Sequence, residues 1–174
     1  IKQGKKSNKM DKQEVYDFLN DNGISFEITE HPAVYNMAEL ADVELPYPEA
    51  DAKNLFVRDD KHRAFYLITV KGDKRVDLKQ FRRDYGTRAL SFASDEELME
   101  LMGLIPGAVT PLGLLNDTDK RVQFYLDEEL TGDGALIGVH PNDNTATIWL
   151  KTDDLAEILR KSGHEVNIYR GRIL

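Results

Sequence analysis

The pattern of apolar and polar positions predicts helices and strands that are mixed along the chain. Apolar residues at helical spacing, each run closely followed by a glycine, predict helices over residues 11–22, 78–85, 96–102 and 153–161. Asn36, followed three residues later by Glu39, is similar to a capping box and predicts a further short helix through about Val43. Runs of β-forming residues predict strands over residues 24–29, 53–58, 64–70, 89–92, 122–126, 135–139, 145–150 and 166–169.

These elements predict a single α+β domain. Strands and helices do not alternate regularly, so we expect a mixed β-sheet or open barrel that is flanked by helices. The run 64–70 consists almost entirely of β-formers and should be a central strand. The length of 174 residues suits one domain, which we place at residues 10–174. Residues 1–9 are expected to be a flexible basic leader, or residues left by an expression vector.

Charge is unevenly distributed along the chain. The net charge of −8 argues against unspecific binding to nucleic acid, and no DNA partner is expected. The segment from Lys71 to Arg88 has seven basic residues against three acidic ones and is therefore +4, which leaves −12 for the rest. A local basic surface on an acidic protein favours a specific anionic partner, and a solvated helix face is the alternative.

Several kinds of chemistry are disfavoured by what the sequence lacks. It has no cysteine, and therefore no disulfide, thiolate metal site or cysteine nucleophile. It has no dinucleotide-binding glycine motif, no P-loop and no Gly-x-Ser-x-Gly elbow. The four histidines are far apart without metal-ligand spacing, so no metal site is expected. No apolar run approaches the roughly 20 residues that span a bilayer, and no membrane partner is expected.

The segment from Gly103 to Leu115 has three glycines and two prolines and is otherwise apolar except for Thr110. Such a segment is either a tight connection under the core or a wall of backbone amides that a ligand can approach closely. Composition alone leaves both open. Within it, Gly107-Ala108-Val109-Thr110-Pro111 has a Gly-x-x-x-Pro arrangement that could direct N–H groups at a carbonyl oxygen.

Two further motifs contain residues suited to a site. Lys53-Asn54 opens a strand of Leu, Phe and Val, where a lysine and an amide are unusual unless they face a cleft. The alternative is an exposed strand start with a solvated lysine. His140-Pro141-Asn142 lies in the turn between two predicted strands, and its alternative is a loop histidine with local hydrogen bonds.

Five motifs occur in a characteristic order: His31-Pro32-Ala33-Val34, Lys53-Asn54-Leu55-Phe56, Gly72-Asp73-Lys74-Arg75-Val76-Asp77-Leu78, Gly107-x-x-x-Pro111-Leu112-Gly113 and His140-Pro141-Asn142. In these motifs the sequence resembles the YbaK/ProX family of aminoacyl-tRNA deacylases, which is related to the editing domain of bacterial prolyl-tRNA synthetases. The resemblance covers nearly all of residues 10–170. The branch with Lys-Asn-Leu-Phe and His-Pro-Asn is similar to the free-standing alanyl-tRNA(Pro) deacylases.

The resemblance implies roles for individual residues. Lys53 is expected to be indispensable and to hold the terminal phosphate or orient the ester, with Asn54 beside it. The segment Gly107-Ala108-Val109-Thr110-Pro111 would offer backbone amides to the ester carbonyl or the amino acid. His140 would line the pocket, and Asn142 would bind the substrate or support the histidine turn. The basic residues expected to bind tRNA are Lys71, Lys74, Arg75, Lys79, Arg82 and Arg83.

The implied function is cofactor-free hydrolysis of alanyl-tRNA(Pro) in the cytoplasm. A synthetase site built for proline rejects alanine weakly, since missing methylenes change binding by only about 1–3 kcal/mol. The expected partner is misacylated tRNA(Pro), and prolyl-tRNA synthetase is a further candidate. Two alternatives remain: a deacylase for cysteinyl-tRNA(Pro) or another small misacylated tRNA, and a non-catalytic module that binds tRNA or an aminoacyl group.

Overall fold

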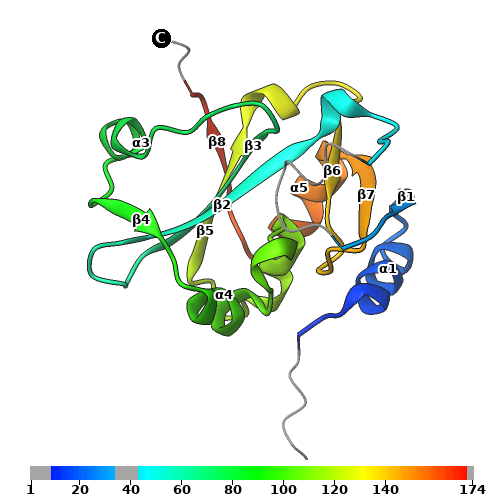
Figure 1. Ribbon diagram of the computed structural model, residues 1–174, viewed down its shortest axis with the longest axis horizontal. Helices are drawn as coiled ribbons and strands as arrows, with labels where there is room; N and C mark the ends of the chain where they lie inside the picture. Colours follow the sequence, from blue (N-terminus) through cyan, green and yellow to red (C-terminus); the bar gives the residue numbers. More distant parts are fainter. Residues whose placement is uncertain (1–8, 34–42, 172–174) are drawn as a thin grey trace, which may run out of the picture.

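A mixed sheet of five strands forms the centre of the molecule (Figure 1). The computed structural model describes residues 9–33 and 43–171. In order across the sheet, the strands are β4 (Leu90–Phe92), β2 (Ala52–Asp59), β3 (Phe65–Lys71), β5 (Val122–Asp127) and β8 (Val166–Tyr169). β2 pairs antiparallel with β3 and β4, whereas β3, β5 and β8 are parallel. The predicted α+β fold with a mixed sheet is therefore confirmed, and β3 is the central strand.

A smaller antiparallel sheet lies beside the first and consists of β1 (Glu27–Glu30), β7 (Ala146–Lys151) and β6 (Leu136–Val139). The two sheets meet where β6 approaches β2 (Figure 1). Gly138 of β6 lies opposite Trp149 of β7. A Cβ atom at Gly138 would collide with the indole ring, and Trp149 Nε1 donates a hydrogen bond to Thr29 Oγ1 at 3.0 Å. The absence of a side chain at residue 138 thus makes room for the largest side chain of this sheet.

Helices cover the two faces of the five-stranded sheet. The main core lies between one face, the smaller sheet and three helices, which are α1 (Lys12–Asp21), α4 (Asp95–Met102) and α5 (Thr152–Lys161). The other face is covered by α3 (Leu78–Tyr85), whose Phe81 and Tyr85 join a cluster of aromatic rings from the strands. Because strand side chains alternate between faces, Phe56 of β2 enters the main core and Val57 enters the aromatic cluster.

The helix ends follow the local chemistry of the sequence. Asp77 accepts hydrogen bonds from the first amides of α3, and Ser94 with Glu97 forms the predicted capping box of α4. Gly86 and Gly103 end these helices in the left-handed conformation, with φ of 68° at each. These predictions are confirmed.

Three predictions concern the N-terminal part of the chain. The strand predicted at 24–29 is wrong in its bounds, since β1 comprises Glu27–Glu30. The Ile24 amide instead donates to the carbonyl of Leu19 at 3.0 Å, so this residue belongs to the end of α1. The helix predicted from Asn36 lies outside the described residues except for Val43, as does the leader except for Lys9.

A buried hydrogen bond between a histidine and a carboxylate joins the last part of the chain to the start of β5. His164 Nε2 donates to Asp117 Oδ2 at 3.1 Å, and both side chains are 2% exposed. The same carboxylate accepts hydrogen bonds from the amides of Arg121 and Val122 at 3.0 and 2.8 Å. Burial would raise the pKa of Asp117, but the hydrogen bonds from His164 and the two amides outweigh it and lower the pKa.

We predict that Asp117→Asn lowers the free energy of unfolding by roughly 1–3 kcal/mol, because it leaves buried donors unsatisfied. Denaturant unfolding measures this effect, and Asp119→Asn, at an exposed neighbouring position, should change it little. A carboxyl whose pKa is lowered in the folded protein stabilises the fold at pH values above its unfolded pKa of about 3.9. This stabilisation is lost as the pH falls through the pKa of the carboxyl in the folded protein. Stability should therefore fall less steeply below about pH 4 in Asp117→Asn than in the wild type. Equal acid sensitivity in both proteins would contradict this role.

Candidate functional site

Asn54 joins two of the motifs that the sequence singled out. It lies on β2 opposite Thr69 of β3. Its Oδ1 accepts a hydrogen bond from Thr69 Oγ1 at 2.6 Å, and its Nδ2 donates to the carbonyl oxygen of Val109 at 3.2 Å. The side-chain amide therefore connects the central hairpin to the Gly-x-x-x-Pro segment, which is 55 residues away in the sequence.

The segment that contains Val109 is built from two short 3-10 turns, η2 (Pro106–Ala108) and η3 (Pro111–Asn116). Ala108, Thr110 and the following residues 111–114 are buried, so the segment is a tight connection under the core. The amide of Val109, which is half-buried, has no acceptor among the described residues. The tight connection is therefore confirmed, and the wall of backbone amides that a ligand can approach stays a prediction.

Lys53 is half-buried and has no hydrogen-bond or ion-pair partner in the part of the chain that the structure describes. It lies opposite Val70, and strand alternation places it on the sheet face of Leu55, away from Asn54. No contact joins Lys53 to Val109 or His140. The structure therefore unites Asn54 with the Val109 segment, and it leaves Lys53 as a separate, unpaired cation at the start of the same strand.

His140 follows β6 directly and is half-buried. Its Nδ1 lies 3.0 Å from the carbonyl oxygen of Ala146, which closes the turn between β6 and β7. Burial lowers the pKa of His140, and the nearby His31 lowers it further, so the ring is neutral at pH 7. The imidazole of His31 lies edge-on at a centroid distance of 6.2 Å. The local hydrogen bond expected of a loop histidine is present.

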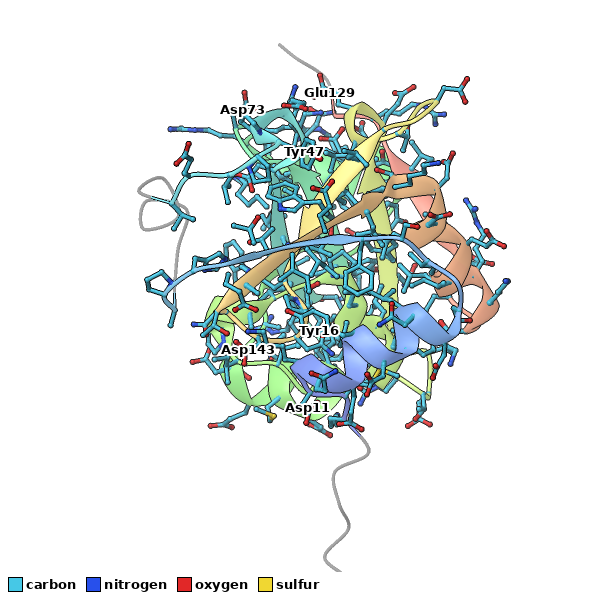
Figure 2. The ribbon with its side chains drawn as sticks, turned by 90° about the vertical axis from the view of Figure 1, so that its right-hand side faces the viewer. Asp11, Tyr16, Tyr47, Asp73, Glu129 and Asp143 are labelled. Atoms are coloured by element: carbon cyan, nitrogen blue, oxygen red, sulfur yellow. The ribbon has the colours of Figure 1, made fainter. Side chains whose placement is uncertain are left out.

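The first turn of α1 holds the histidine turn in place. Asn142 adopts a left-handed conformation, with φ of 59°, and donates from Nδ2 to the carbonyl oxygen of Met10 at 3.2 Å. Lys12 donates to Thr145 Oγ1 at 2.9 Å, and Thr145 in turn contacts Asp143. Figure 2 shows Asp143 at the end of the turn that faces α1. Asn142 Oδ1 is buried and accepts no hydrogen bond from the described residues.

The predicted tRNA-binding residues form two groups. Lys79, Arg82 and Arg83 are exposed on α3, as predicted. The other three line a surface cavity at the carboxyl ends of β3, β5 and β8, together with acidic residues that include Asp73 and Glu129 at the top of Figure 2. The cationic side chains of this cavity are Lys71, Lys74 and Arg75.

Lys74 is largely neutralised within the fold. Its Nζ lies 2.8 Å from the buried carboxylate of Asp127 and 2.6 Å from that of Glu129. Burial would lower the pKa of Lys74, but these hydrogen bonds outweigh it and raise the pKa, so the lysine stays charged. The lysine serves to compensate the buried charge of Asp127, and a distant phosphate would be attracted mainly by the other cations of the group.

The sequence did not single out Thr69 or Asp127 for the site, and it indicated His31 only as part of a motif. Thr69 is a polar residue inside an apolar strand, and it is fully buried. A buried hydroxyl requires a hydrogen-bond partner, so a threonine inside this apolar strand was the sequence signal for the contact. No group of three or more potential ligands for a metal ion occurs among the described residues. No helix among them has the length and apolar character to cross a membrane.

The sequence and the fold of this chain are similar to those of several known proteins. The family model of the aminoacyl-tRNA editing domain matches residues 31–158. The prolyl-tRNA editing protein ProX of Acetoanaerobium sticklandii is 37% identical over 153 residues, which cover 88% of this chain and 93% of that protein. Prolyl-tRNA synthetase associated domain-containing protein 1 of Danio rerio is 34% identical and covers 88% of this chain and 83% of its own. A solved structure of a candidate trans-editing enzyme for prolyl-tRNA synthetase superposes with a TM-score of 0.65 at 25% identity, over 92% of this chain and 97% of that one.

We predict that Asn54→Ala loosens the Val109 segment, because it leaves the Thr69 hydroxyl and the Val109 carbonyl without their partner. The free energy of unfolding should fall by about 1–3 kcal/mol, and hydrogen exchange should become faster at residues 107–111. The matched control is Asn167→Ala, which removes a similar side-chain bond to the carbonyl of Phe124 at 3.0 Å. That variant should leave exchange at residues 107–111 unchanged. Equal exchange in both variants would refute the role of Asn54.

Proposed function

This chain belongs to the aminoacyl-tRNA editing domain family, and we propose that it is a trans-editing hydrolase that removes alanine from mischarged tRNA(Pro). The observation that carries the proposal is the hydrogen bond between Asn54 and the carbonyl of Val109. It fixes a segment with an open backbone donor, the amide of Val109, to the strand that carries Lys53. An ester hydrolase needs such fixed donors beside the reacting carbonyl.

In the proposed mechanism, the aminoacyl ester lies against the segment Gly107–Pro111. The open amide of Val109 stabilises the oxyanion that forms when water attacks the ester carbonyl. One such donor is worth roughly 2.7–4 kcal/mol in the transition state. Lys53 supplies positive charge for the terminal phosphate or orients the ester, and the neutral ring of His140 bounds the pocket. The attacking water is positioned with help from the ribose hydroxyl of the substrate, so no cofactor is needed.

Alanine is the preferred substrate in this proposal, on the resemblance to the free-standing alanyl-tRNA(Pro) deacylases. A small site that admits alanine and excludes proline completes the selection that a proline-activating site makes poorly. Cysteinyl-tRNA(Pro) is the second candidate, because its side chain is also small. A non-catalytic module would bind the same RNA without turnover, and the open amide of Val109 favours catalysis over it.

The proposed partner is the acceptor stem of tRNA(Pro), bound by the exposed cations of α3 and by Lys71 and Arg75. The similarity to prolyl-tRNA synthetase associated domain-containing protein 1 of Danio rerio supports a proposal that this chain also binds that synthetase. With these partners, the proposed place of action is the cytoplasm.

We predict that the protein deacylates alanyl-tRNA(Pro) and spares prolyl-tRNA(Pro), and that Lys53→Ala reduces turnover at least about 100-fold, as the loss of a main transition-state contact does. Single-turnover hydrolysis of a panel of aminoacyl-tRNAs measures both. Lys61→Ala, which removes an exposed lysine in the turn after the same strand, should retain full activity. Faster hydrolysis of cysteinyl-tRNA(Pro) would favour the second candidate, and tight binding without hydrolysis would favour the non-catalytic module.

We predict that replacing Lys79, Arg82 and Arg83 together by alanine weakens tRNA binding and makes it less dependent on salt. Each lost phosphate contact should lower the slope of log affinity against log salt by roughly 0.7–0.9. Hydrolysis of a short alanyl-adenosine ester should remain nearly intact. The control removes the same charge from the other side of the molecule, at Lys151, Arg160 and Lys161. If both triple variants bind tRNA alike, the α3 face is only a solvated surface.

A further inference from the structure

A carboxylate lies close to Lys53 along the same stretch of chain. Asp51 follows the 3-10 turn η1 (Pro48–Ala50) and has an extended backbone, with φ of −63° and ψ of 139°. Its carbonyl oxygen accepts a hydrogen bond from the amide of Gly72 at 2.9 Å, so the pairing of β2 with β3 extends to residue 51. Because side chains alternate along an extended strand, Asp51 and Lys53 lie on the same face.

Neither of these two charges is neutralised within the described part of the chain. Asp51 is half-buried, and its carboxylate forms no ion pair or hydrogen bond with another side chain there. Burial raises the pKa of Asp51, and the backbone amide of Ala52 offsets only part of this effect. Lys53 is likewise half-buried, and no ion pair joins it to Asp51. Partly buried charges without partners cost free energy and are typical of sites that a ligand completes.

The start of β2 has an unpaired edge. Among the described residues, β4 pairs with β2 along residues 57–59 and leaves the start of the strand free. Alternate residues of an antiparallel strand form backbone hydrogen bonds on opposite sides, and the bond from Gly72 to Asp51 assigns the odd-numbered residues to β3. The backbone groups of Ala52 and Asn54 therefore point to the other edge, where β6 comes near but belongs to the second sheet. A ligand at this edge can contact both faces of the strand.

The spacing of the two charges suits one ribonucleotide. Residues two positions apart on a strand are separated by roughly 6–7 Å. A phosphate binds an ammonium group, and a ribose hydroxyl donates a hydrogen bond to a carboxylate. These two groups are neighbours along an RNA backbone. Because Asp51 would repel a phosphate that came alone, the pair favours a ligand that also brings a donor.

We propose that Asp51 and Lys53 form a ribose-phosphate subsite for the single-stranded 3′ end of tRNA, in which Asp51 accepts a hydrogen bond from a 2′-hydroxyl beside the phosphate that Lys53 binds. Asp51 is then a specificity-determining residue that distinguishes RNA from DNA. This role rests on the proposed function, in which Lys53 faces the terminal phosphate. The subsite lies on the sheet face of α3, and the ester reaches the Val109 segment across the open edge of β2.

The test measures the affinity of the full chain for short oligonucleotides that end in CCA and carry alanine as a 3′-amide, which resists hydrolysis. One probe has ribose throughout, and the other has 2′-deoxyribose in the nucleotides before the terminal adenosine. The wild type should prefer the ribose probe roughly 10- to 100-fold, as expected for a hydrogen bond to a charged group. In Asp51→Ala this preference should fall to within about threefold. The deoxyribose probe should bind to this variant at least as tightly as to the wild type, since a negative charge beside the phosphate is gone.

Two further variants separate the carboxylate from its surroundings. Glu49→Ala is the matched control, because Glu49 is an exposed carboxylate in the preceding turn, and it should keep the preference for ribose. Lys53→Ala should weaken the binding of both probes and reduce its salt dependence while the preference stays. If Asp51→Ala does not fold, Asp51→Asn takes its place and should lower the preference by at least about threefold.

Equal binding of both probes by the wild type, or an unchanged preference in the folded Asp51 variant, would overturn the ribose contact. An equal loss on both probes that disappears for oligonucleotides without alanine would overturn it as well, because Asp51 would then bind the ammonium group of the amino acid. An equal loss on every probe would reduce Asp51 to a structural contact. Absence of hydrolysis of every aminoacyl-tRNA by the wild type would instead refute the proposed function, and the binding preference is measured without hydrolysis.

Discussion

The hydrogen bond from Asn54 to the carbonyl of Val109 is the contact on which the geometry of the site depends. The regular structure of the Val109 segment consists of two short 3-10 turns. The amide of Asn54 connects it to the central sheet, where Thr69 fixes the orientation of that amide from the neighbouring strand. A site supported by a central sheet keeps its donors in place more precisely than one built on free loops.

A second set of contacts, made by β7, holds the histidine turn. This strand carries Ala146 and Thr147, the hydrogen-bond partners of His140 and His31, and Met10 and Lys12 at the start of α1 secure the turn between β6 and β7. The N-terminal helix is thus more than a cover for the core. It forms part of the support of the histidine turn, although the sequence places them more than 120 residues apart.

Local chemistry predicted most of the fold, and tertiary contacts account for what it could not predict. The caps at Asp77 and Ser94 and the hairpin of β2 and β3 depend on neighbouring residues, so sequence patterns indicate them. The start of β1 was misplaced because Ile24 completes the end of α1. The pairing of Lys74 with Asp127 joins residues 53 positions apart, and a count of basic residues cannot register it. For the same reason the motifs contained Asn54, His140 and His31, whereas Thr69 and the contact between the two histidines required the structure.

The close approach of Gly138 and Trp149 has a consequence for how related sequences can vary. A mutation at either position alone meets an obstacle: a side chain at residue 138 has no space, and a smaller residue at 149 leaves a void beneath a bare backbone. Only an exchange in both positions preserves the volume between β6 and β7. Among descendants of a common ancestor, residues 138 and 149 should therefore change together.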